Sequence, residues 1–98
     1  MNTVCPKKLG LGFVLKVNSD DHNPVHMYCE DYDGNLITKI LLTDKPTSEN
    51  DIYVCDGYPE LSHDQKKALL KWANSNNRLG LNNWLHALAT WNDYHSDE

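Results

Sequence analysis

The sequence predicts a single α+β domain, in which a small antiparallel sheet of three or four strands precedes two helices packed on one of its faces. Three observations predict this class. Apolar residues alternate with polar ones through the first half, an Asp-Gly pair separates two such runs, and the second half changes to helical spacing. Ninety-eight residues are enough for one core. We expect one domain over residues 1–98, with a strand half at about 11–57 and a helical half at about 62–95.

The first half contains three runs with the periodicity of a strand, Leu11–Val17, Val25–Asp31 and Leu36–Leu42. A polar connection that ends in Pro24 separates the first two, and Pro24 suits the entry of a strand. A shorter apolar run, Ile52–Cys55, is the candidate for a fourth strand.

The pair Asp33-Gly34 predicts a hairpin with a two-residue type I′ turn between the second and third runs. Such a turn fixes which residues face each other across the hairpin. The expected pairs are Cys29 with Thr38, Met27 with Ile40, Val25 with Leu42, His26 with Leu41, Tyr28 with Lys39 and Glu30 with Ile37. The first three pairs would form the core face and the other three the opposite face.

Ser62 and Gln65 form a capping-box pattern, which predicts the start of the first helix. Its expected inner stripe is Leu69, Leu70 and Ala73, with Trp72 at the edge of the stripe. We therefore select Trp72 as a partly exposed partner contact. Gly80 is a candidate for a left-handed terminator of this helix. A second helix is expected to begin near Asn82 or Asn83, with Trp84, Leu85, Leu88 and Trp91 at helical spacing.

Charge and cysteine content limit the class of partner and the compartment. Nine basic and fourteen acidic side chains give a net charge of −5, which is unfavourable for binding phosphates, and the second helix contains no Lys or Arg. The three cysteines include no Cys-x-x-Cys pair, and the chain has neither a secretory signal nor an apolar run of membrane-span length. We expect a reduced, cytoplasmic protein that binds neither nucleic acid nor membranes.

The side chains best suited to bind a ligand or to transfer a proton lie on one face of the second strand. They are His26, Tyr28 and Glu30. Successive members would lie about 6.5–7 Å apart between Cα atoms. Such a row could bind a polar ligand or act as an acid and a base in an enclosed pocket; alternatively, it is an ordinary sheet face. No nucleophile–base–orienter set is evident, so we assign no catalytic residue. We also assign no metal or cofactor, because His26 and Cys29 point to opposite faces of the strand.

The order of elements, the strand Pro24–Glu30 and the tail Trp91–Tyr94 resemble a family of small bacterial domains of unknown function. Members of that family carry Pro-Pro-His-x-His and then a hydrophobic residue and Glu on the second strand, and they end in a Trp-Asn-x-aromatic tail. Here Val25 stands in place of the second proline and Tyr28 in place of the second histidine. Some members are associated with toxin–antitoxin-like gene pairs, so the resemblance implies a regulatory role.

These observations predict a non-enzymatic protein-interaction or regulatory module that acts on another protein. Its specific forms are an antitoxin-like protein, or an acidic inhibitor of a nucleic-acid-binding protein that would dissociate steeply with salt. The alternative is a small enzyme or ligand-binding protein that uses the face of His26, Tyr28 and Glu30.

Overall fold

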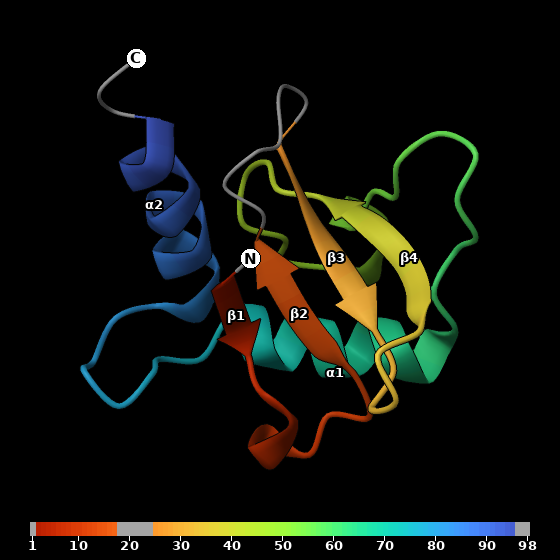
Figure 1. The fold of residues 1–98 in the computed structure, drawn as a ribbon, viewed down its shortest axis with the longest axis horizontal. Helices are drawn as coiled ribbons and strands as arrows, with labels where there is room; N and C mark the ends of the chain where they lie inside the picture. The colour runs from red at the N-terminus through yellow and green to blue at the C-terminus, as the bar shows by residue number, and fades with distance from the viewer. Residues whose placement is uncertain (1, 18–24, 96–98) are drawn as a thin grey trace.

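The computed structural model describes residues 2–17 and 25–95, and it has the predicted α+β fold (Figure 1). The strands form one antiparallel sheet in sequential order, and the core residues of both helices pack against a single face of that sheet. The strands are β1 (Asn2–Cys5), β2 (Val14–Val17), β3 (His26–Glu30) and β4 (Leu36–Leu41). The helices are α1 (His63–Ala73) and α2 (Asn83–His95), with short 3₁₀ turns η1 (Lys7–Leu9) and η2 (Glu49–Asp51).

The fourth strand is β1 and not the predicted run Ile52–Cys55. That run meets β4 through a single bridge, between Val54 and Ile40, flanked by a 2.8 Å hydrogen bond from the Leu41 amide to the Tyr53 carbonyl. β2 also begins later than Leu11 because Gly10 and Gly12 have positive φ angles of 71° and 89°, which interrupt an extended strand. A four-residue strand that begins with polar Asn2 and Thr3 carries little periodic signal.

The core forms where the apolar face of the sheet meets α1 and α2. β2 and β3 alternate strictly between half-buried and buried residues, as a sheet with one covered face requires. On α1 the buried residues are Leu69, Trp72 and Ala73, whereas Leu70 is half-buried. The expected inner stripe is therefore wrong by one position, because the core faces Trp72 in place of Leu70. The largest buried side chains of the sheet and α2 are Phe13, Leu15, Val17, Met27, Ile40 and Trp84.

The β3–β4 hairpin has the predicted register at His26, Met27, Tyr28 and Cys29, but Glu30 faces Leu36 in place of Ile37. The reason is the loop. No non-glycine residue in the described part of the chain has a positive φ, so Asp33-Gly34 cannot form a type I′ turn.

The hairpin loop spans Asp31–Asn35 instead and takes one more residue than predicted. The Asp31 amide donates to the Asn35 carbonyl at 2.8 Å, and Gly34 adopts a φ of 89°. The Asp31 carboxylate accepts from the amides of Asp33 at 2.9 Å and Asn35 at 2.8 Å. This combination of an Asx turn and a left-handed glycine produces the bulge that shifts Glu30.

The same loop occurs a second time, between α1 and α2, over Asn77–Leu81. The Asn77 amide donates to the Leu81 carbonyl at 2.7 Å, and Gly80 has a φ of 80°. The Asn77 side-chain oxygen accepts from the amides of Leu79 at 2.9 Å and Leu81 at 3.1 Å. Gly80 is therefore part of this loop and not the predicted helix terminator, since α1 ends at Ala73.

Asparagine side chains join the end of α1 to the start of α2. The capping box at Ser62 is confirmed at the other end of α1. After Ala73, however, the side-chain amide of Asn82 donates to the Ala73 carbonyl and that of Asn83 to the Trp72 carbonyl, both at 2.9 Å. These bonds give two helix-end carbonyls donors from the start of α2, and the Trp72 carbonyl also accepts from the Ser75 amide at 3.1 Å. The α1–α2 connection is consequently held by side chains as well as by its backbone.

Replacement of Gly34 by alanine should lower the free energy of unfolding by about 1–2 kcal/mol, because a Cβ disfavours the left-handed region. A Cβ added at Gly34 would meet no heavy atom within 4 Å beyond its chain neighbours, so the effect would come from the backbone alone. Gly34→Asn should cost less, since asparagine tolerates positive φ better. Urea denaturation measures both, and an alanine variant as stable as the wild type would contradict the assigned loop.

Asp31 should also make stability depend on pH. The Asn35 backbone amide holds the pKa of the Asp31 carboxyl below its usual value, so its stabilising effect is complete above the unfolded-state pKa and is lost as pH falls through the folded-state pKa. Asp31→Asn should keep the acceptor, as Asn77 does, and reduce the loss of stability at acid pH. Urea denaturation between pH 7 and about 3 tests this. Asp33→Asn in the same loop is the control, and an unchanged pH profile for Asp31→Asn would refute the assignment.

Candidate functional site

The face of the sheet opposite the helices carries the predicted row of β3. His26, Tyr28 and Glu30 lie on this outer face as expected, and each is half-buried. The rings of His26 and Tyr28 meet edge to face, with centroids 5.2 Å apart and planes at 69°. The structure therefore brings the three predicted residues together on one face.

Three neighbours complete this outer-face cluster, which we define as His26, Tyr28, Glu30, Lys16, Lys39 and Tyr58. Lys16 from β2 forms a 2.9 Å ion pair with the Glu30 carboxylate. The Lys39 ammonium lies over two aromatic rings, 5.0 Å from the centroid of Tyr28 and 4.9 Å from that of Tyr58. The hairpin register predicted that Lys39 faces Tyr28. Tyr58 follows an irregular segment, so no periodic signal could place it here.

The chemistry of the outer-face cluster consists of charges and rings that interact with one another. The Glu30 side chain is only 14% exposed and its charge is matched by Lys16. Cation–π contacts of the kind that Lys39 makes are worth about 0.5–1 kcal/mol at exposed sites. The cluster therefore supports the sheet, and it contains no serine, threonine or cysteine as a nucleophile.

The cysteine nearest to this row in sequence lies on the other side of the sheet. Cys29 is fully buried in the core, as predicted, and burial raises the pKa of its thiol to about 12. Burial likewise raises the pKa of Cys5 to about 11. Among the described residues, no group of three or more His, Cys, Asp or Glu side chains is arranged to hold a metal ion. His22, and Pro24 of the strand motif Pro24–Glu30, lie outside the described residues.

Trp72 is not the partly exposed side chain that the sequence predicted. It is only 3% exposed and belongs to the core. Trp72 nevertheless contributes to the lining of a cleft that the sequence did not reveal.

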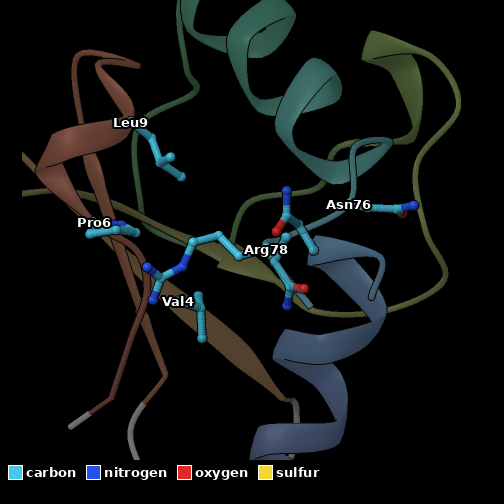
Figure 2. A pocket seen from close by; sticks show the side chains of 7 residues that line it. Val4, Pro6, Leu9, Asn76 and Arg78 are labelled. Atoms are coloured by element: carbon cyan, nitrogen blue, oxygen red, sulfur yellow. The ribbon is translucent and has the colours of Figure 1, made fainter. Parts of the chain in front are cut away.

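A cleft lies between the β1–η1 segment and the α1–α2 connection (Figure 2). Its volume is about 450 Å³, within the usual range for ligand pockets. Its lining residues are Val4, Pro6, Leu9, Asn76, Asn77, Arg78 and Asn83. A second cleft of about 300 Å³ adjoins it and shares Leu9, Asn76 and Asn83. Sequence reasoning missed this site because its two walls are about seventy residues apart in the chain.

Arg78 dominates the electrostatics of the first cleft. Its side chain extends from the α1–α2 loop across the cleft toward Pro6 and Val4 (Figure 2). No carboxylate in the described residues pairs with Arg78. Lys71, on the last turn of α1, has no such partner there either and lines the second cleft. Two cations thus lie in this region of a chain whose net charge is −5.

Exposed leucines follow the cleft residue Arg78 along the α1–α2 loop and into the first turn of α2. Leu79, Leu81 and Leu85 are 80%, 49% and 53% exposed, and we call these three the leucine rim. Leu9, which lines both clefts, is 49% exposed. Among the described residues these four are the majority of the seven large apolar side chains that are exposed. Three of the four therefore lie in the α1–α2 loop and the first turn of α2, close in the chain to Arg78, and Leu9 lies in the cleft itself.

Comparison with known proteins finds no matching family model, no matching curated protein and no matching solved structure. Of the helices in residues 2–17 and 25–95, none combines the length and the apolar character needed to cross a membrane.

The burial of two of the cysteines predicts selective thiol chemistry. With iodoacetamide at about pH 8, near the ordinary thiol pKa, the half-buried Cys55 should be alkylated first, and Cys5 and Cys29 only after unfolding. Mass spectrometry of the native and the urea-unfolded protein measures this. Cys55→Ser should abolish the first modification, and rapid native alkylation of Cys29 would contradict its place in the core.

Proposed function

We propose that this protein is a non-enzymatic interaction module that binds another protein through the leucine rim and the cleft beside it. The observation that carries the proposal is the exposure of Leu79, Leu81 and Leu85 in the segment that directly follows Arg78, a residue of the cleft. Contiguous exposed apolar side chains around a concave surface are typical of protein-binding sites, and arginine is enriched among residues that dominate binding energy.

The rigidity of the rim supports this proposal. Leu79 and Leu81 receive their positions from the Asn77 side chain, which accepts hydrogen bonds from both of their amides. A loop that is already ordered loses little conformational entropy when a partner binds. Full burial of a leucine side chain contributes about 1.5–3 kcal/mol, so burial of the three leucines would contribute several kcal/mol to the free energy of binding.

The outer-face cluster gives less support to the enzymatic alternative. An enzyme of this type needs a nucleophile or a base that is directed into a site where substrate can bind. Glu30 is already paired with Lys16, and Lys39 lies between two tyrosine rings. These contacts account for Glu30 and Lys39 without a substrate.

The acidic-inhibitor form of the proposal also receives less support, because several carboxylates have structural partners. Asp31 holds the hairpin loop, Asp51 accepts from the Thr47 and Ser48 amides, and Glu49 contacts His63 at 2.7 Å. We favour an antitoxin-like or other regulatory role in which apolar contact dominates. The buried thiols of Cys5 and Cys29 suit a reducing compartment such as the cytoplasm.

The double variant Leu79→Ser/Leu81→Ser should weaken partner binding by about 30-fold or more, which corresponds to about 2 kcal/mol of lost apolar burial. The measurement is quantitative recovery of a partner in affinity purification from the native host, followed by titration of the purified complex. Leu36→Ser, a leucine that is 46% exposed at the start of β4, is the matched control.

Equal thermal midpoints of both variants would show that folding is not the cause. A partner that binds the double variant as tightly as the wild type, or one that only Leu36→Ser releases, would refute the proposal. Failure to recover any specific partner would refute it as well.

A further inference from the structure

We infer that the two adjoining clefts recognise a peptide segment of the partner in which apolar side chains lie between two carboxylates. This inference rests on the proposed function and adds to it the chemical class of the partner.

The apolar part of the lining lies in the middle of the composite site. Leu9 from η1 belongs to both clefts, with Val4 and Pro6 on one side and Leu11 on the other. Leu9 is 49% exposed, so it has apolar surface still available to a ligand. The ligand should therefore place an apolar side chain over Leu9.

The charged residues lie on either side of this apolar middle. Arg78 lines only the first cleft and Lys71 lines only the second. Neither has a carboxylate partner among the described residues. A guanidinium matches a carboxylate in both charge and fork geometry, which favours a carboxylate at Arg78. A phosphate dianion would leave one negative charge uncompensated by the single cation of that cleft.

Two side-chain amides that line the clefts, those of Asn77 and Asn83, each have one of their two polar atoms held by the fold. The Asn83 side-chain nitrogen donates to the Trp72 carbonyl, and the Asn77 side-chain oxygen accepts from two loop amides. No described residue bonds to the Asn83 oxygen or to the Asn77 nitrogen. One acceptor and one donor are thus held in orientation, as the backbone of a peptide requires.

A peptide segment fits this site better than a small acid. The two clefts, of about 450 and 300 Å³, are continuous through Leu9, Asn76 and Asn83, and a single small acid would engage only one of the two cations. β1 forms the first edge of the sheet, and its residue Val4 belongs to the lining. Edge strands offer unpaired backbone groups to an extended chain.

The test uses an acetylated and amidated pentapeptide with the sequence Glu-Leu-Val-Leu-Glu, so that its only charges are the two side chains. Titration into the ¹⁵N-labelled protein should shift the side-chain signals of Arg78, Asn77 and Asn83. The same peptide with glutamine in place of both glutamates should bind at least tenfold more weakly. Arg78→Gln should weaken binding of the acidic peptide by about tenfold, since it removes a charge-assisted contact.

Lys45→Gln is the matched control, because it removes the same charge from an exposed position outside both clefts, and it should leave binding unchanged. Equal binding of the glutamine peptide, equal effects of Arg78→Gln and Lys45→Gln, or shifts confined to the outer-face cluster would each overturn the inference. Absence of any shift at millimolar peptide would overturn it too.

The two proposals can fail separately. If Leu79→Ser/Leu81→Ser releases the native partner but the acidic peptide does not bind, the peptide class is wrong and the interaction function stands. If the acidic peptide binds and Arg78→Gln weakens it, while the leucine variant retains its partner, the cleft chemistry stands and the rim is not the interface.

Discussion

The constraint on which the rest of the structure depends is that β3 can bury only one of its faces. Met27 and Cys29 lie fully inside the core, so the residues between and beside them must emerge on the other side. That alternation fixes the register of both neighbouring strands, since β2 and β4 must present their own apolar residues on the same side. It also assigns His26 and Tyr28 to the opposite face, where their rings meet edge to face.

The sequence predicts what depends on short-range periodicity, and it fails where distant segments meet. The pairing of Tyr28 with Lys39 follows from residues within one hairpin, and the capping box at Ser62 lies within one turn. The sequence did not predict β1, because β1 begins with the polar residues Asn2 and Thr3 and is joined to β2 by a connection that contains glycines. The cleft was missed because Leu9 and Arg78 belong to separate halves of the chain, and only the folded core brings them together.

Two of the predictions were wrong for reasons that lie within a few residues of the feature: the two-residue turn and the inner stripe of α1. Asp33-Gly34 suggested a two-residue turn, but the Asp31 carboxylate two positions earlier captures the loop amides and adds a residue to it. On α1, Leu70 and Trp72 flank the stripe of Leu69 and Ala73 on opposite sides, and the buried flank is the one that carries the larger ring. α1 ends at Ala73, directly before the asparagine-rich segment 74–77. The side chains of Asn82 and Asn83, at the start of α2, then donate to the carbonyls of Ala73 and Trp72.

The five-residue loop occurs twice, and a comparison of the two copies shows which of its residues determine the backbone conformation and which do not. Asn77 and Gly80 provide everything that the backbone needs: an acceptor for two amides and a left-handed φ. Arg78, Leu79 and Leu81 contribute no side-chain hydrogen bond to that geometry, and the hairpin loop reaches it with Tyr32, Asp33 and Asn35 at the same places. Residues at these three places can therefore change by mutation without altering the loop's shape. A lineage could exchange one binding specificity for another here while the scaffold remains constant.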